Sequence, residues 1–204
     1  MTQTDNFHYI HLRCHSEFSI TDGIVRINDY IEKAKTAGMP AVALTDLSNV
    51  FGAVKFYKAA LEAGIKPIIG CDFWLENEIS RDQPYRLLML CQNDEGFLNL
   101  SELLSKAYLE NQYRDRVEIK KSWFQKTNTA GLIILSGATS GELGQLIIQG
   151  KLDQAQASLV EWKERFGDRF YLEIQRHGQG NFKEQQERYI EQALHLAVDY
   201  DVPI

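Results

Sequence analysis

Short apolar segments alternate with segments of helical period along most of this chain. Several of the apolar segments lack a polar face, as expected for strands that are covered by helices on both sides. This alternation predicts an α/β domain with largely parallel strands. The expected strands cover residues 7–12, 41–45, 66–75, 86–91, 132–135 and 170–175, and a last strand begins at 202.

Apolar residues recur at three- and four-residue steps over 27–34, 97–108 and 152–166, and a further helix is expected over 183–200. These stripes are interpreted as core contacts. The polar segment 111–129 has no clear period and is expected to be a surface excursion from a single domain covering residues 1–204. Because Val-Pro-Ile at 202–204 resembles the start of a buried strand, we expect the chain to be part of a longer polypeptide.

Charge and cysteine content exclude several classes of protein. The 204 residues carry 22 Lys and Arg against 28 Asp and Glu, a net charge of −6, so no bulk positive field is available to hold a nucleic-acid backbone. No apolar run is long enough to cross a membrane, and the first residues do not resemble a signal peptide. The three cysteines form no Cys-x-x-Cys pair, which favours reduced thiols. A soluble cytoplasmic protein is therefore expected.

The first cluster of chemically active residues is His-Leu-Arg-Cys-His-Ser at 11–16. In an extended segment His11, Arg13 and His15 would share one face. Two imidazoles on one face suit a divalent metal, but a permanently charged guanidinium between them does not. Taken alone, the cluster is either half of a metal site or a hydrogen-bonded structural group.

Polar residues also follow or interrupt other expected strands. In parallel α/β folds, ligands bind at the carboxyl ends of the strands. Thr45 and Asp46 end one strand, and Asp72 interrupts an apolar strand, where its carboxylate needs a cation, a donor or a metal. Asp22 either caps the following helix or points to the same pocket. His177 follows the strand at 170–175 and is either structural or a further pocket residue.

Several common catalytic motifs are absent from the sequence. It contains no Walker loop, no Gly-x-Gly-x-x-Gly, no Gly-x-Ser-x-Gly and no His-Glu-x-x-His. Nucleotide binding through a phosphate loop and serine hydrolysis are therefore not supported.

The strings at 11–23, 43–49, 51–57, 64–73 and 135–137 resemble the polymerase and histidinol phosphatase (PHP) domain, in particular the one at the N-terminus of bacterial replicative DNA polymerase III alpha subunits. The resemblance covers essentially the whole chain. It implies a distorted seven-stranded β/α barrel, here incomplete at its C-terminal end. Members that bind a cluster of divalent ions hydrolyse phosphoesters, in some polymerases as a built-in proofreading exonuclease.

The sequence departs from the family's ligand pattern. The resemblance implies His-x-His where this chain has Arg13 and His15, and Thr-Asp-His where it has Thr45, Asp46 and Leu47. A glutamate is implied at Asp72. The positions that fit weakly as metal ligands are His15, Asp22, Asp72 and His177. The last ligand motif of the family follows the strand that begins at Val202 and is not part of this chain.

We therefore expect a vestigial metal pocket with no catalytic residue and no bound metal, in which Arg13 donates to some of Asp22, Asp46 and Asp72. The resemblance implies a scaffold that docks the proofreading exonuclease (epsilon) subunit. It further implies polymerisation with Mg²⁺ in the remainder of the alpha subunit, and DNA contact only through the intact subunit. The alternative is a residual phosphoesterase, pyrophosphatase or 3'–5' exonuclease that uses Mg²⁺, Mn²⁺ or Zn²⁺ on the same residues.

Overall fold

The structure is a computed structural model that describes residues 9–125, 127–176 and 183–204. Its internal contacts divide the chain into two compact units, residues 1–72 and 73–204, and each is described by itself. The first unit contains every predicted pocket residue except His177, which lies outside the described residues.

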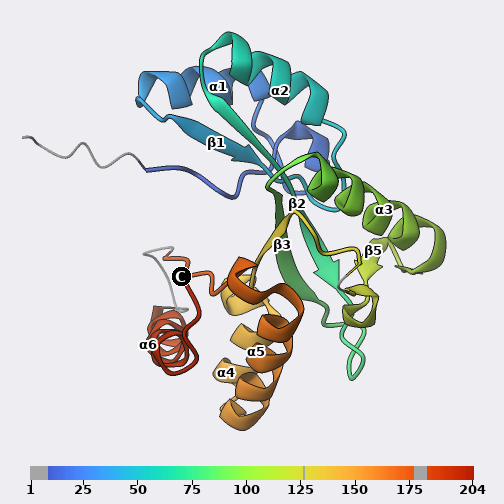
Figure 1. Ribbon diagram of the computed structural model, residues 1–204, viewed down its shortest axis with the longest axis vertical. Coiled ribbons are helices and arrows are strands. Elements are labelled where there is room, and N and C mark those ends of the chain that lie inside the picture. Colours follow the sequence, from blue (N-terminus) through green and yellow to red (C-terminus); the bar gives the residue numbers. More distant parts are fainter. Residues whose placement is uncertain (1–8, 126, 177–182) are drawn as a thin grey trace, which may run out of the picture. The chain divides into compact units, whose positions relative to one another are not determined.

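In the first unit two helices cover one face of a parallel strand pair (Figure 1). Strand β1 (Ala41–Leu44) pairs with the first half of β2 (Lys66–Leu75). Helices α1 (Ile27–Thr36) and α2 (Ala53–Glu62) contact each other above them. The buried core between these elements consists of Ile27, Ile31, Ala34, Val42, Leu44, Phe56, Ala60 and Ile65.

The segment before the first helix was predicted as a strand over residues 7–12, but its described part has no strand. It still runs along β1, because the Ala43 N–H donates to the His11 carbonyl and the Thr45 N–H to the Cys14 carbonyl, both at 2.9 Å. The two acceptor residues, His11 and Cys14, are three positions apart, whereas the two donor residues, Ala43 and Thr45, are two positions apart. The ladder is therefore irregular, as at a β-bulge. A short 3₁₀ turn, η1 (Glu17–Ser19), follows.

The second unit contains a mixed sheet. Its strands are the end of β2, β3 (Tyr85–Cys91), β4 (Gln112–Tyr113), β5 (Arg116–Ile119), β6 (Leu132–Leu135) and β7 (Phe170–Tyr171), in the order β4-β5-β2-β3-β6-β7. The β2–β5 and β6–β7 pairs are parallel, whereas β3–β6 and β4–β5 are antiparallel. Fewer strands are parallel than predicted, because loops without a helix, such as the one between β2 and β3, are too short for a parallel crossover.

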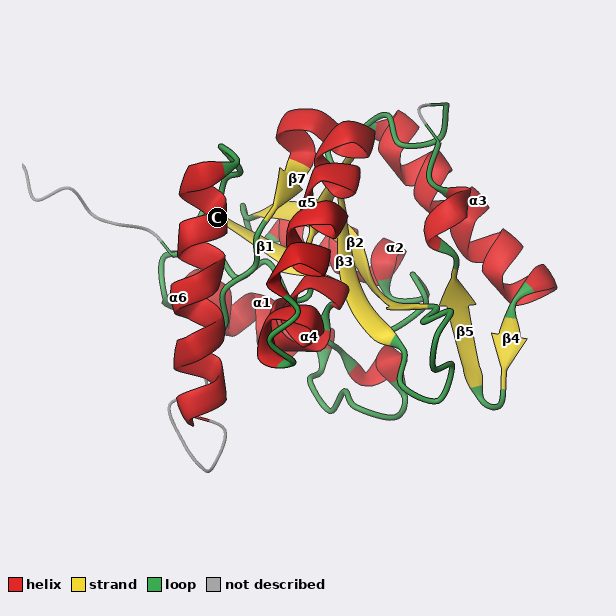
Figure 2. Ribbon diagram, turned by 90° about the horizontal axis from the view of Figure 1, so that it is seen from below, coloured by secondary structure: helices red, strands yellow, loops and turns green. Residues whose placement is uncertain are grey.

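The helices of the second unit are α3 (Asp94–Glu110), α4 (Glu142–Ile148), α5 (Leu152–Phe166) and α6 (Lys183–Asp199), with short turns η2 (Lys121–Trp123), η3 (Ala138–Ser140) and η4 (Gly167–Arg169). Figure 2 shows α4 beside α5, and α4 also contacts α6. The Trp162 ring stacks on Phe170 at 6.1 Å and meets Phe124 edge-on at 5.5 Å. The predicted helices over 27–34, 97–108, 152–166 and 183–200 are confirmed within a few residues.

The segment 111–129 is more than the surface excursion that its polarity predicted. It contains β4, β5 and η2, and the side chains of Ile119 and Phe124 are buried. The fully buried Glu118 carboxylate lies 3.1 Å from Arg81 Nε and 3.1 Å from Arg116 Nη2. Charged residues of this segment therefore pair with one another and with Arg81 in the second unit.

The predicted strand over 170–175 is shorter in the structure, where β7 covers only Phe170–Tyr171. The Leu172 N–H nevertheless donates to the Pro203 carbonyl at 2.9 Å, and Val202 is buried. The last residues thus lie beside the continuation of β7, as the strand prediction at 202 requires. None of the helices in the described part of the chain has the length and apolar character that a membrane crossing requires.

Candidate functional site: a carboxylate pocket in the first unit

The extension of the β1–β2 pairing brings two acidic residues together. Beyond β1, the Asp72 N–H donates to the Asp46 carbonyl at 3.2 Å, and the Ser48 N–H donates to the Asp72 carbonyl at 2.7 Å. Leu47 and Asp72 form an isolated parallel bridge. Asp46 is 1% exposed and Asp72 is fully buried, so both carboxylates need compensating partners from the protein.

Arg13 supplies the compensating charge for Asp72. Its Nη1 donates to Asp72 Oδ2 in an ion pair, with the arginine side chain 24% exposed and the aspartate side chain fully buried. A charge-assisted hydrogen bond to a buried carboxylate is among the stronger polar interactions in a protein. The prediction that Arg13 donates to a pocket carboxylate is confirmed for Asp72.

His15 connects two carboxylates. Its Nε2 lies 3.0 Å from Asp72 Oδ2, and its Nδ1 lies 2.9 Å from Asp22 Oδ2. A neutral imidazole has one N–H donor, so only the doubly protonated ring can donate to both aspartates. Asp22 therefore points into the pocket, and the alternative in which it caps α1 is not the observed one, because the α1 N-cap residue is Arg26 and no side chain caps it.

Asp46 is surrounded by neutral donors. Its Oδ1 accepts hydrogen bonds from the Ser16 N–H at 2.6 Å and from the Ser19 hydroxyl at 2.9 Å. The Ser16 hydroxyl lies 3.0 Å from both carboxylate oxygens. Ser19 Oγ also accepts from the Leu47 N–H at 3.0 Å, which ties η1 to the chain that follows β1. These contacts satisfy Asp46 without a cation.

The neighbouring thiol and phenol belong to the packing of the pocket wall. Burial raises the pKa of Cys14 to about 11, with a hydrogen bond from Tyr30 lowering it and the Asp46 charge raising it further. Burial likewise raises the pKa of Tyr30, and the nearby Cys14 adds to that effect. Tyr30 donates to the Ala43 carbonyl at 3.2 Å, so it anchors α1 to β1. Neither group is an activated nucleophile.

The structure brings together Arg13, His15, Asp22, Asp46 and Asp72, with Leu47 in the bridge to Asp72. It does not describe His177. The sequence reasoning missed Ser16 and Ser19, which carry most of the bonds to Asp46. Their position beside a motif rich in histidine and acidic residues is a signal that could have identified them, since short hydroxyl side chains in turns commonly donate to nearby polar groups.

We tested whether these residues fit the divalent metals that bind to some proteins of this type. The guanidinium of Arg13 occupies the donor position at Asp72, and both ring nitrogens of His15 face carboxylates. Leu47 offers no ligand atom. Within residues 9–125, 127–176 and 183–204, no group of three or more His, Cys, Asp or Glu side chains has an arrangement that could hold a metal ion. Among the residues that the structure describes, which do not include His177, the donor set therefore does not fit such a metal.

The arrangement of strands and helices defines the chain as an α/β protein with a mixed sheet. It resembles a crystal structure from Bifidobacterium adolescentis that is described as a metal-dependent phosphoesterase, with a TM-score of 0.58 over 96% of this chain and 85% of that one. The sequences are 14% identical, so the likeness concerns the fold alone.

This chain belongs to the PHP domain family, whose model matches residues 11–177. Its relatives include proteins named DNA polymerase III subunit alpha. The one from Vibrio cholerae is 41% identical over 96% of this chain, and that from Pseudomonas fluorescens is 45% identical over 87%. The one from Neisseria meningitidis is 46% identical over 82%. The matches span 15 to 16% of the relatives' lengths, so this chain corresponds to about one sixth of such a protein.

Proposed function

We propose that this chain is the PHP domain of a bacterial replicative DNA polymerase III alpha subunit, and that it acts there as a non-catalytic scaffold that docks the proofreading exonuclease subunit. The relatives named DNA polymerase III subunit alpha support the first part. The contact between Arg13 and Asp72 supports the non-catalytic role, because it places a permanent positive charge where metal-binding members of the family need a ligand.

The charges of the pocket support a structural role for it. Arg13 neutralises Asp72, His15 lies between Asp22 and Asp72, and serine donors surround Asp46. Hydrolysis of a phosphoester at a metal centre needs an open coordination position and an activated water. A pocket whose carboxylates are already paired with protein donors offers neither. Its interactions instead join η1, β1 and β2 into one stable unit.

The remaining activities of such a subunit are assigned to the rest of the polypeptide. Nucleotidyl transfer and its Mg²⁺ would belong there, and DNA would be contacted through the intact subunit, in line with the net charge of −6 on this chain. The cytoplasm is the compartment of replication in bacteria, so we propose that location.

A second candidate function is a residual phosphoesterase or pyrophosphatase, or a 3'–5' exonuclease. It is favoured by a cavity of about 390 Å³ in the first unit, whose lining includes Arg13, Arg26 and Lys33. These cations could attract a phosphoryl group. Arg13 and Arg26 are engaged with Asp72 and Glu17, however, so a phosphate would have to compete with carboxylates for both of them.

Metal analysis and a binding assay test the proposal together. The full-length polypeptide that carries this sequence is purified without chelators, and its Mn, Mg and Zn contents are measured beside its phosphoesterase activity. We expect substoichiometric metal, no activity that depends on His15, and direct binding to the purified exonuclease subunit at low salt. Stoichiometric metal with activity that is lost in His15→Ala would establish the phosphoesterase instead. Lack of binding to the exonuclease would refute the scaffold role.

A further inference from the structure

Arginine side chains and aromatic rings alternate on one surface of the second unit. The guanidinium carbons lie 4.3 to 5.8 Å from the centres of the rings, within the range of cation–π attraction. Energetically significant contacts of this kind occur about once in 70–80 residues, so their concentration here is unusual. We call this set the arginine–aromatic cluster: Arg86, Trp74, Arg116, Tyr113, Arg81 and Arg114.

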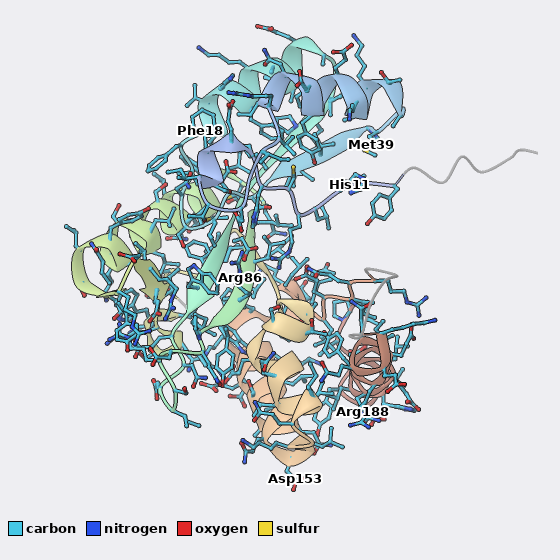
Figure 3. The ribbon with its side chains drawn as sticks, turned by 180° about the vertical axis from the view of Figure 1, so that it is seen from behind. His11, Phe18, Met39, Arg86, Asp153 and Arg188 are labelled. Carbon is cyan, nitrogen blue, oxygen red and sulfur yellow. The ribbon has the colours of Figure 1, made fainter. Side chains whose placement is uncertain are left out.

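The pairing of the strands places the centre of the cluster on one face of the sheet. Trp74 on β2 lies opposite Glu118 on β5, and Tyr113 on β4 lies opposite Arg116 on β5. Directly opposed residues share a face, and Arg116 and Glu118 share one because they are two residues apart in a strand. Arg86 from β3, which is labelled in Figure 3, lies over the Trp74 ring at 4.3 Å.

A buried carboxylate fixes two of the arginines. Glu118 is completely buried, and it accepts from Arg81 Nε at 3.1 Å and from Nε and Nη2 of Arg116 at 3.2 and 3.1 Å. Contacts through two nitrogens fix the plane of a guanidinium group. In the described part of the chain, the Nη1 atoms of Arg81 and Arg116 donate to no acceptor, and neither atom is buried. Both therefore remain available to an acceptor from outside the domain.

The ion pairs of the cluster turn their positive ends outward. The side chains of Arg81 and Arg116 are 36% and 22% exposed, whereas that of their shared partner Glu118 is not exposed. Arg114 is 63% exposed and lies 3.1 Å from Asp82, which is 56% exposed. Although the whole chain has a net charge of −6, guanidinium groups are thus more exposed on this surface than the carboxylates with which they pair.

We infer that the arginine–aromatic cluster binds a single strand of nucleic acid. The phosphates of the strand would accept from Nη1 of Arg81 and Arg116, because a planar guanidinium group matches the geometry of a phosphate. Its bases would stack on the guanidinium planes and the rings, as in proteins that bind single strands without sequence preference. An acidic peptide offers carboxylates but no planar bases, so the alternation of rings and guanidinium groups favours nucleic acid. This contact is additional to the proposed scaffold role and does not depend on it.

Photocrosslinking of the full-length polypeptide locates the bound strand. A single-stranded oligothymidylate that contains 4-thiothymidine is irradiated with the protein, and the adducts are identified by peptide mass spectrometry. We expect adducts on the peptides that contain Trp74 or Tyr113. Unlabelled oligothymidylate should compete for them, whereas polyglutamate of equal charge should compete at least about tenfold less well, because it cannot stack.

A charge reversal with a matched control tests the role of the arginines. Arg114→Glu changes an exposed residue that does not hold Glu118, and Arg188→Glu makes the same change on α6, which Figure 3 shows apart from Arg86. We expect the adduct yield at the cluster to fall about fivefold or more in Arg114→Glu and to stay within about twofold in Arg188→Glu. Both variants should unfold at the temperature of the wild type, because both arginines are exposed.

Three results would overturn the inference. The first is that adducts form only outside residues 73–119, and the second is that Arg114→Glu leaves the yield at the cluster within about twofold. The third is that polyglutamate competes as well as oligothymidylate, which would identify the cluster as a surface for acidic peptides. Binding of the exonuclease subunit is measured separately, and its absence in the wild type would refute the scaffold role while leaving this inference in place.

Discussion

The Nη1 of Arg13 and the Nε2 of His15 converge on one oxygen, Oδ2 of Asp72, whose side chain is completely buried. Two partners on a single carboxylate oxygen leave little room for a metal ion at that oxygen. The contact with Arg13 makes the buried aspartate tolerable, because a buried carboxylate without a partner is strongly destabilising.

Removal of Arg13 is expected to destabilise the protein. Arg13→Met removes the guanidinium that pairs with the buried Asp72 carboxylate, and we expect a loss of about 3 kcal/mol or more in the free energy of unfolding in urea. Arg26→Met removes an arginine that is 71% exposed and pairs with Glu17, and it should cost about 1 kcal/mol at most. In the double variant Arg13→Met/Asp72→Asn the loss should be smaller than the sum of the single losses. Additive effects would show that the two side chains do not interact.

Restoration of the family's ligand pattern is expected to restore metal binding. Arg13→His/Leu47→His removes the guanidinium and supplies two imidazoles beside His15 and Asp72, and imidazoles are good ligands for Zn²⁺ and Mn²⁺. We expect the double variant to retain more Zn²⁺ after dialysis than the wild-type protein, as measured by mass spectrometry. Addition of His15→Ala should remove the gain. Equal metal content in the wild type and the double variant would contradict the view that Arg13 and Leu47 exclude the metal.

Ser19 is expected to contribute to stability through Asp46. Its hydroxyl donates to the buried Asp46 carboxylate and accepts from the Leu47 N–H. Ser19→Ala therefore removes one hydrogen bond from Asp46 Oδ1 and one from the Leu47 N–H. We expect a loss of about 1–3 kcal/mol, measured by urea unfolding. Ser105→Ala, which removes an exposed hydroxyl bonded within α3, serves as the control and should change stability by less than about 1 kcal/mol. Equal losses in both variants would argue against a special role for Asp46.

The protein is expected to lose stability at alkaline pH. Burial raises the pKa of Cys14 to about 11 and of Cys91 to about 12, from an ordinary value of 9.0. Above pH 9 the unfolded chain releases these protons while the folded chain keeps them, so stability is full below pH 9 and declines as pH rises toward 11 and 12. Urea unfolding between pH 7 and 10.5 measures the decline.

Thiol labelling offers a separate measurement of the same burial. At pH 8 iodoacetamide should label Cys14 and Cys91 far more slowly in the folded protein than in urea, because the thiolate is the reactive form. Rapid labelling of either residue in the folded protein would contradict the raised pKa of its thiol. Peptide mass spectrometry identifies which cysteine has reacted.

Much of the fold could be predicted because its signals are local. The apolar steps in α1, α3 and α5 identify helices from neighbouring residues alone, and 41–45 and 66–75 identify the strands that carry Asp46 and Asp72. The mixed sheet was less predictable, because strand direction depends on pairings between distant segments. Glu118 illustrates the limit, since a charged residue in a polar segment becomes buried only when Arg81 and Arg116 reach it from other positions.

The candidate site was predictable in its residues but not in its bonds. The acidic and histidine positions follow from their places after strands and from the family resemblance. Their partners do not, because a carboxylate can be satisfied by arginine, histidine, hydroxyl or backbone donors. Only the structure shows that Arg13 serves Asp72, while Ser16 and Ser19 serve Asp46.

By itself, the sequence determined the class of fold, the family and the set of polar residues that meet in the first unit, because periodicity and motifs are properties of short stretches of chain. The tertiary structure decided how the charges of that set are compensated and which nitrogens of Arg81 and Arg116 are left exposed. Compensation of a buried charge depends on distances of about 3 Å between atoms that are far apart in sequence, and exposure depends on what else packs nearby. Neither can be read from spacing along the chain.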